Sequence, residues 1–322
     1  MEPALSVRTV YLPHSAFPAM EPLSRASSPA LDAILGQTFK VLDDGFVRVV
    51  DYMGNDTSIV QAARVSYGDG TKKGSDDEHL IRYLMRHRHT TPFEMCELKL
   101  HVRAPMDVWR QWVRHRTASI NEYSTRYSLA IDAARELAPD EWRGQSTTNR
   151  QGSGEALPSD VGAALSAEEK EFHAAARALY EKRIEAGVSR EIARKDLPLA
   201  TYTEAYWKCN LKNLLHFLAL RMPGAAQYEI RVYAELIGRE IVSRWVPAAW
   251  KAFCDYQLEA VAFTAPEQKI VPLLAKGDSA AALDAALALG FVKRHDDGSL
   301  KVLREGAELA AKLPALGLAC PW

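Results

Sequence analysis

Residues 94–103 alternate between apolar and polar side chains, and this pattern is the strongest constraint on the fold. The apolar positions are Cys96, Leu98, Leu100 and Val102, and the polar positions are Glu97, Lys99, His101 and Arg103. Successive side chains of a β-strand point to opposite faces of its sheet, so the alternation predicts a half-buried strand. One face of that strand needs apolar partners from elsewhere in the chain.

Two capping boxes indicate helices before and after this strand. Ser75-x-x-Glu78 precedes apolar residues at helical spacing, and Ser166-x-x-Glu169 precedes a longer helical pattern that Gly187 closes. In a capping box, the first side chain accepts a hydrogen bond from a backbone N–H of the first turn, and the last side chain reaches back. Glycine readily adopts the conformation that ends a helix. The sequence therefore predicts helices that begin near both boxes.

Another helix is expected directly after the alternating strand, because Pro105 suits the first helical position. Residues 197–209 are predicted to form a second strand, and residues 210–221 and 226–245 are predicted to form two more helices. The helices and strands do not follow a regular βαβ order. The expected fold class is therefore α+β, with a mixed sheet packed with long helices in a single catalytic domain.

Composition divides the chain into three parts. Residues 1–38 are rich in proline and serine without periodicity, and they are expected to form a loosely ordered arm. Residues 39–260 hold the strand and helix patterns of the catalytic domain, with an inserted loop expected near 144–160. Residues 261–322 are expected to form a helical extension, in which Asp-Asp-Gly-Ser at 296–299 indicates a turn between two short strands. The role of this extension is left open.

Charge and cysteine usage argue against several classes of protein. The 40 basic and 41 acidic residues give a formal charge of -1, which disfavours binding to nucleic acid or to an anionic membrane. No stretch approaches the roughly 20 apolar residues of a membrane span, and the N-terminus lacks the layout of a signal peptide. The four cysteines are widely spaced, so no disulfide framework is expected and a cytoplasmic location fits. His87-x-His89 lacks a third ligand at a useful spacing, so no metal is expected.

Residues 114–128, RHRTASINEYSTRYS, concentrate hydrogen-bond donors. The segment from residue 100 to residue 130 contains no lysine but several arginines, namely Arg103, Arg110, Arg114, Arg116 and Arg126. Arginine offers a planar fork of donors that pairs bidentately with phosphate or carboxylate, whereas lysine is a mobile point charge. The alternative is a solvated basic loop balanced by neighbouring acids. We favour a ligand site, because Gln111 and Arg114 lead directly into the run that contains Glu122.

Arg114-His115-Arg116, followed by seven residues and Ser124, resembles the signature of the flavin-dependent thymidylate synthases. Four other segments resemble that family in the family's order: GFVRVVDYMGNDTSIVQAARVS, HLIRYLMRHRHTTPFE, ARKDLPL and NLLHFLALR. Together the five segments span about residues 41–253, which excludes a chance match as a serious alternative. The arm, the 144–160 insertion and the tail lie outside the resemblance, so it assigns them no role.

The resemblance implies synthesis of dTMP from dUMP, with methylenetetrahydrofolate as carbon donor, FAD as cofactor and NADPH as hydride source. It also implies a homotetramer with active sites at subunit interfaces. The residues at the family's dUMP positions are Gln111, Trp112, Val113, Arg114, Glu122, Tyr123, Ser124, Thr125, Arg126, Arg194 and Arg221. Arg221 is the implied catalytic residue, because a fixed guanidinium beside the uracil ring would stabilise negative charge. Ser124 has no evident histidine and carboxylate partners, so ligand binding suits it better than nucleophilic attack.

The resemblance also implies flavin contacts. The residues at the family's FAD positions are Ser66, His89, Thr91, Arg114, His115, Arg116, Glu122, Asn210, Leu211, Lys212 and His216. His216 taken alone is more simply an ordinary histidine on an apolar helix, and only the resemblance favours a flavin contact. Ala225 stands where the family usually has a histidine, so a flavin contact is expected to be missing there, with His216 as a possible replacement. No Rossmann fingerprint is present, so FAD must be held without one.

Two other functions remain open at this point. A paralogue could use the same site to methylate or hydroxymethylate another pyrimidine nucleotide, such as UMP. A nucleic-acid-binding module would instead use the arginines on backbone phosphates. The formal charge near zero and the lack of a long basic face argue against that module.

Overall fold

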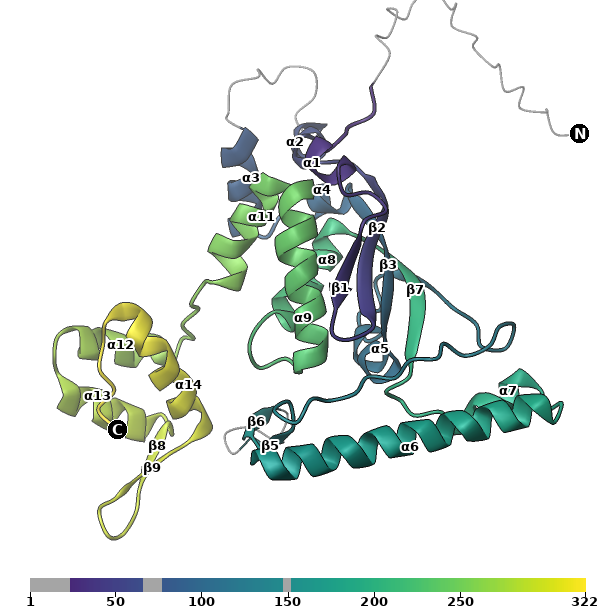
Figure 1. The fold of residues 1–322 in the computed structure, drawn as a ribbon. Helices are drawn as coiled ribbons and strands as arrows, with labels where there is room; N and C mark the ends of the chain where they lie inside the picture. The colour runs from purple at the N-terminus through teal and green to yellow at the C-terminus, as the bar shows by residue number, and fades with distance from the viewer. Residues whose placement is uncertain (1–23, 66–76, 147–151) are drawn as a thin grey trace, which may run out of the picture. The chain divides into compact units, whose positions relative to one another are not determined.

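The computed structural model describes residues 24–65, 77–146 and 152–322. The chain divides into two compact units between Ala252 and Phe253. Composition placed the start of the C-terminal extension at residue 261, but the second unit begins earlier, at Phe253. Figure 1 shows the elements of both units.

The first unit holds the helices α1 (Pro29–Asp32), α2 (Asp56–Arg64), α3 (Asp77–Arg86), α4 (Thr91–Glu94), α5 (Met106–Trp112), α6 (Ser159–Glu185), α7 (Arg190–Ala193), α8 (Leu211–Arg221), α9 (Tyr228–Leu236) and α10 (Ser243–Trp245). Its strands are β1 (Thr38–Val41), β2 (Gly45–Met53), β3 (Glu97–Pro105), β4 (Ser119–Glu122), β5 (Arg143–Gln145), β6 (Ser153–Ala156) and β7 (Tyr202–Asn210). A 3-10 turn, η3 (Arg194–Asp196), follows α7, and a π-helical segment, η4 (Ile237–Val242), joins α9 to α10. Helix α11 (Pro247–Phe253) ends at the boundary between the units.

The main sheet has the strand order β1-β2-β3-β7-β4. Strand β3 confirms the alternating pattern, because Leu98, Leu100 and Val102 are buried while the residues between them are half-buried. Helix α5 contacts β3 and helix α8 contacts β7, which covers the apolar face of the sheet (Figure 1). The α+β prediction is confirmed. Every strand pair is antiparallel, so the sheet is not mixed in strand direction as predicted.

Helix α6 begins at Ser159, seven residues before the predicted capping box, so that prediction was wrong. The two side chains of the box bind another segment instead of the helix end. Ser166 Oγ donates to the Leu137 carbonyl at 2.7 Å and accepts the indole N–H of Trp142 at 2.9 Å. Glu169 accepts the backbone N–H of Leu137 at 2.7 Å. The pattern therefore marks a docking point for the segment that precedes β5.

Part of the predicted N-terminal arm belongs to the fold. Helix α1 lies within residues 1–38, and its Leu31 is fully buried. Ser28 Oγ donates to the carbonyl of Arg244 at 2.9 Å, which ties α1 to α10. The prediction of a loose arm was wrong for this stretch, because one buried leucine and its flanking hydrogen bonds hold it. Ser75, the first residue of the other predicted capping box, lies outside the described residues.

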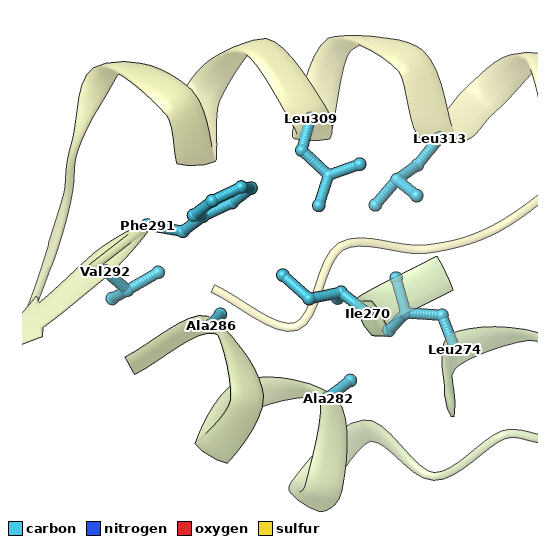
Figure 2. Packing of buried hydrophobic residues seen from close by; sticks show 8 residues of the cluster. All are labelled: Ile270, Leu274, Ala282, Ala286, Phe291, Val292, Leu309 and Leu313. Atoms are coloured by element: carbon cyan, nitrogen blue, oxygen red, sulfur yellow. The ribbon is translucent and has the colours of Figure 1, made fainter. Parts of the chain in front are cut away.

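The second unit has its own apolar core, which Figure 2 shows. It contains η5 (Cys254–Leu258), α12 (Glu267–Ala275), α13 (Ser279–Ala288), β8 (Val292–Arg294), β9 (Leu300–Val302), α14 (Arg304–Lys312) and η6 (Leu313–Leu316). The antiparallel pair β8–β9 confirms the predicted turn. Lys312 binds both carboxylate oxygens of the buried Glu267, at 2.8 and 2.9 Å. Across the described residues of both units, no helix combines the length and apolarity needed to cross a membrane.

Gly45, the first residue of β2, provides a test of this packing. A Cβ at this position would overlap the hydroxyl of Tyr233 and come within 2.6 Å of the Val41 carbonyl. Tyr233 cannot retreat without losing its hydrogen bond to the Arg103 carbonyl, at 2.7 Å. Gly45→Ala should therefore lower the free energy of unfolding by about 1–3 kcal/mol, measured by urea denaturation. Gly144→Ala, whose Cβ would meet nothing closer than 3.8 Å, is the control and should change stability little.

Candidate active site

Arg221 lies at the C-terminal end of α8, and its position follows from how this helix is anchored. Asn210, the last residue of β7, caps the helix by accepting the backbone N–H of Asn213 at 2.9 Å. Such a cap satisfies one of the unpaired N–H groups in the first turn. The buried residues of the helix are Leu211, Leu214, Leu215, Phe217 and Leu218. The cap and this apolar face fix the helix, which leaves Arg221 half-buried at its far end.

His115 accepts a hydrogen bond from Arg221, with 3.1 Å between Nε of the arginine and Nε2 of the imidazole. The imidazole packs edge-on against Phe217, and the ring of His216 lies 6.0 Å away between centroids. Burial, together with the positive charges of Arg221 and His216, lowers the pKa of His115 to about 4. The ring is therefore neutral near pH 7, and its Nε2 can accept while Nδ1 holds the proton. A guanidinium is thus oriented by a neutral partner.

Burial also lowers the pKa of Arg221. An arginine side chain nevertheless remains charged at any physiological pH. The pair therefore carries one positive charge, which resides on Arg221.

Trp112 fixes the end of α5, from which the signature segment departs. Its fully buried ring stacks on Phe217 with centroids 4.8 Å apart, and the ring of Trp207 meets it edge-on at 5.5 Å. Trp112 is among the residues at predicted dUMP positions, and Leu211 is among those at FAD positions. Both side chains are fully buried, so any ligand contact from these residues would come through the main chain.

Arg221 borders a cavity of about 1020 Å³, which we call the Arg221 cavity. Gln111 and Arg221 line it, together with Ala225, the residue that replaces the expected histidine. The side-chain amide of Gln111 donates to the side-chain oxygen of Gln227. Nε2 of Gln227 in turn donates to the carboxylate of Glu229 at 2.8 Å. The structure therefore brings together two residues at predicted dUMP positions, Gln111 and Arg221, in a space large enough for an organic ligand.

A second set of predicted residues gathers where β4 ends. Glu122, its last residue, accepts a hydrogen bond from the hydroxyl of Thr203 at 3.2 Å. Arg194 donates to the hydroxyl of Thr125 at 2.5 Å. Arg126 pairs with Glu191 at 3.1 Å, with more than half of its side chain exposed. Two predicted nucleotide-binding arginines thus stand around the loop that follows the strand.

His89 and Thr91 line a third region, a cavity of about 860 Å³. Its walls are mainly apolar and include Met53, Tyr83 and Met95. A hydroxyl and an imidazole at the rim of an apolar cavity suit a flat aromatic ligand with a few polar atoms. His89 is between α3 and α4, and Thr91 is the first residue of α4, so both are apart in sequence from Arg221.

The remaining predicted residues lie on loops and helix ends. Val113 follows α5, and Arg114 and Arg116 follow it as exposed side chains. Tyr123 and Ser124 are in the loop after β4, where the Tyr123 hydroxyl donates to the Leu129 carbonyl at 2.8 Å. Lys212, in the first turn of α8, donates to the Asn213 side chain at 3.3 Å. Ser66 lies outside the described residues.

The two cysteines of the first unit do not have the environment of an activated thiolate. Cys96 and Cys209 are buried, and burial raises the pKa of Cys96 to about 12 and raises the pKa of Cys209 as well. Cys254 and Cys320 belong to the second unit. A nucleophilic thiolate needs a lowered pKa and a place beside the substrate, and the two cysteines of the first unit lack the lowered pKa. Within the described residues no group of histidine, cysteine and acidic side chains could hold a metal ion.

Several residues of the Arg221 cavity could not be found from motifs or spacing in the sequence. Arg143 of β5 lies over the ring of Tyr228, and Arg231 of α9 lies over the same ring. All three line the cavity. Arg143 is in a segment with ordinary loop composition, and no motif spacing relates it to Tyr228. Only the folded arrangement shows that they belong to the site.

Comparison with known proteins identifies close relatives. A family model described as thymidylate synthase complementing protein matches residues 48–248. A flavin-dependent thymidylate synthase of Wolbachia pipientis wMel is 52% identical over 259 residues, which cover 80% of this chain and 91% of the relative. A protein of the same name from Gluconobacter oxydans is 47% identical over 293 residues, which cover 90% of this chain and 92% of the relative. Both alignments are longer than the predicted catalytic range of residues 39–260, so they also include residues outside that range.

Solved structures give a consistent comparison. PolB of Streptomyces cacaoi, a UMP/dUMP methylase bound with 5-Br dUMP, is similar to this chain with a TM-score of 0.61 and 32% sequence identity. The match covers 68% of this chain and 99% of PolB. The same protein bound with 5-Br UMP is similar to the same degree.

The contact between Arg221 and His115 can be tested by titration. Arg221→Leu removes a positive charge that lowers the pKa of His115, so this pKa should rise from about 4 toward the ordinary value of 6.5. NMR of histidine-labelled protein would measure it, with Arg177→Leu on α6 as a control that should leave the pKa unchanged. In the wild type, the unfolded chain binds more protons at this residue between pH 6.5 and 4, so its contribution to stability rises with pH over that window. An unchanged pKa in the Arg221 variant would refute the contact.

Proposed function

Because this chain belongs to the flavin-dependent thymidylate synthases, which are methyltransferases, we propose that it converts dUMP to dTMP. The one-carbon unit would come from methylenetetrahydrofolate, and NADPH would supply the reducing equivalents. FAD would be the flavin cofactor. The observation that most supports this reaction is the guanidinium of Arg221, held by neutral His115 in the same cavity as Gln111.

Arg221 is the catalytic residue of this proposal. Activation of the uracil ring for attack through C5 places negative charge on the ring, and a guanidinium beside N3 and O2 would stabilise that charge. A donor that is already oriented does not have to reorganise as the charge develops, so its effect is large. His115 supplies the orientation without neutralising the arginine. Gln111 would add a neutral hydrogen bond to the nucleotide.

Arg126 and Arg194 would bind the phosphate of dUMP, with Ser124 and Thr125 as neutral donors beside them. Both arginines stand at the loop after β4, where a dianionic phosphate could replace the present partners. We infer that this loop completes the Arg221 cavity of a neighbouring subunit in a homotetramer. Exposed apolar side chains on the edge strand support this assembly, with Ile120 38% and Tyr206 on the adjoining strand 44% exposed.

The residues present suit FAD in two places. His89 and Thr91 would hold one aromatic part of the cofactor in the 860 Å³ cavity, whose apolar walls suit a planar ring. Arg114 and Arg116 are exposed cations suited to its diphosphate. Asn210 and Lys212 at the start of α8 add polar contacts, and His216 near His115 could replace the histidine missing at Ala225. When bound, FAD supplies hydride chemistry, which makes a protein thiolate unnecessary.

The state of the cysteines agrees with this mechanism and with a cytoplasmic location. All four are free thiols, and burial makes thiolates of Cys96 and Cys209 unfavourable. We propose that no protein nucleophile forms a covalent bond to the uracil ring. The thiols also suit the reducing cytoplasm, where we place the protein.

UMP is the second candidate substrate. The similar structure of PolB is that of a UMP/dUMP methylase, whereas the relatives at about 50% identity are named thymidylate synthases. The higher identity and coverage of those relatives favour dUMP. The two substrates differ only in the 2′-hydroxyl, so a direct competition assay distinguishes them.

The proposed reaction predicts three properties of the purified protein. It should bind FAD, run as a tetramer in light scattering, and form dTMP from dUMP, methylenetetrahydrofolate and NADPH. Bound FAD would be visible by absorption, and radiolabelled dUMP or UMP would report the product. Faster turnover of UMP than of dUMP would favour the second candidate. A monomer that takes up no FAD at micromolar concentration would argue against both.

The roles of Arg221 and Arg194 predict different kinetic effects. Arg221→Ala should lower kcat by about 10²–10³, the loss typical of one preorganised charge-stabilising donor. Arg194→Ala should mainly raise the KM for dUMP, by about 10-fold or more, because a charged hydrogen bond contributes about 1.5–3 kcal/mol. Steady-state kinetics of both variants would measure the split. Small and equal effects of both variants on kcat and KM would show that dUMP does not contact Arg221 and Arg194 as proposed.

A further inference from the structure

The β5–β6 hairpin forms part of the wall of the Arg221 cavity. Residues Arg143, Gly144 and Gln145 from β5 and Ser153 from β6 line the cavity, as do Gln111 and Arg221. The two strands pair antiparallel. Apart from Arg143, the residues of the two strands fall within the insertion predicted near 144–160, to which the resemblance assigned no role. A part of the chain outside the signature therefore supplies side chains to the candidate active site.

Arg143 is a positioned cation in this wall. Its guanidinium lies over the ring of Tyr228, 5.5 Å from the centroid, and the guanidinium of Arg231 lies over the same ring at 5.6 Å. Arg231 is engaged by the Gly224 carbonyl at 3.0 Å and by Glu235 at 4.0 Å. The side chain of Arg143, by contrast, has no hydrogen bond or ion pair within the described parts of the chain. Stacking on Tyr228 orients its guanidinium and leaves its N–H donors available.

The acidic residues of the cavity differ in whether a neighbouring cation offsets their negative charge. Glu141 is paired with Arg135 at 2.5 Å, and Glu229 accepts a hydrogen bond from Gln227 at 2.8 Å. Asp140 lines the same cavity and has no ion pair among the residues that the structure describes. An anion that binds at Arg143 would therefore be attracted by this guanidinium and repelled by the carboxylates of Asp140 and Glu229, neither of which has an ion pair among the described residues.

The volume of the cavity leaves room for more than a nucleotide. Sites for drug-sized ligands measure about 300–1,000 Å³, and this cavity is at the upper end at about 1020 Å³. In the proposed reaction, Arg221 and Gln111 contact dUMP, whose phosphate is assigned to Arg126 and Arg194. Among the other substrates, NADPH carries phosphates, whereas the folate carries carboxylates, on the glutamate attached to its benzoyl ring. Each added glutamate in a polyglutamate tail adds one more carboxylate.

We propose that Arg143, stacked on Tyr228, binds the glutamate tail of the folate co-substrate, so that the β5–β6 hairpin sets the preference for polyglutamylated folate. This inference rests on the proposed function, because it names the part of the same cavity that takes the carbon donor. The planar fork of arginine suits a carboxylate, and the ring of Tyr228 offers an aromatic surface beside it.

The test compares monoglutamyl and pentaglutamyl methylenetetrahydrofolate in steady-state kinetics. Arg143→Ala should raise the KM for the pentaglutamate by about 3- to 5-fold, the upper range for an exposed ion pair, and the KM for the monoglutamate by less. Asp140→Asn removes the opposing charge, so it should lower the KM for the pentaglutamate. Arg304→Ala on α14, which removes an exposed arginine that does not line the cavity, is the matched control. The KM values for dUMP and NADPH should not change in any of these variants.

A binding measurement separates this inference from the proposed reaction. Fluorescence titration of the full-length, dUMP-saturated protein with tetrahydrofolate pentaglutamate should show the same 3- to 5-fold loss in Arg143→Ala. Equal folate affinity in the variant and the wild type would overturn the role of Arg143. A rise in the KM for dUMP instead would mean that the anion is the nucleotide phosphate, and it would also overturn the proposal. If the wild type makes no dTMP, the proposed function fails, while the titration still decides whether Arg143 binds the tail.

Discussion

Stacking between Trp112 and Phe217 is the interaction on which the Arg221 site depends. The rings lie 4.8 Å apart and join the end of α5 to the middle of α8. Burial of each ring contributes about 1.5–3 kcal/mol, and an aromatic pair adds about 0.5–1.5 kcal/mol. His115 follows Trp112 by three residues, and Arg221 follows Phe217 by four, which is one helical turn. Once the rings stack, the imidazole and the guanidinium come within hydrogen-bond distance.

The position of β4 supports the proposed homotetramer, in which one chain by itself would make an incomplete site. Strand β4 is the last strand of the sheet and pairs with β7 along one edge. Its other edge has no strand partner in the described parts of this chain. All four of its residues are exposed. The loop that follows holds Arg126, and Arg194 of η3 contacts the same loop at Thr125. Proteins normally protect an open edge with another element or another chain. A second copy of this chain would cover the edge and bring the phosphate-binding loop to a neighbouring cavity.

The local patterns predicted much of the fold, but not the contacts of the site. Alternation at 96–102 predicted β3 because the period of side chains in a strand is fixed. The capping box predicted at Ser166 was wrong, because the Ser166 hydroxyl and the Glu169 carboxylate bind the segment around Leu137 instead of a helix end. These contacts depend on the tertiary structure. The hydrogen bond from Arg221 to His115 joins residues 106 positions apart, so spacing alone could not predict it. The family resemblance named both residues but assigned them to different ligands.

The choice of partner for Arg221 has a consequence for catalysis. Other arginines of this domain pair with carboxylates, such as Arg103 with Glu204 and Arg126 with Glu191. A carboxylate would orient Arg221 equally well, but its negative charge would oppose the charge that develops on a substrate nearby. A histidine with a pKa of about 4 orients the guanidinium and remains neutral over the working pH range. Arg221 would therefore keep its full positive charge for the proposed ligand, and its partial burial would reduce the screening of that charge by water.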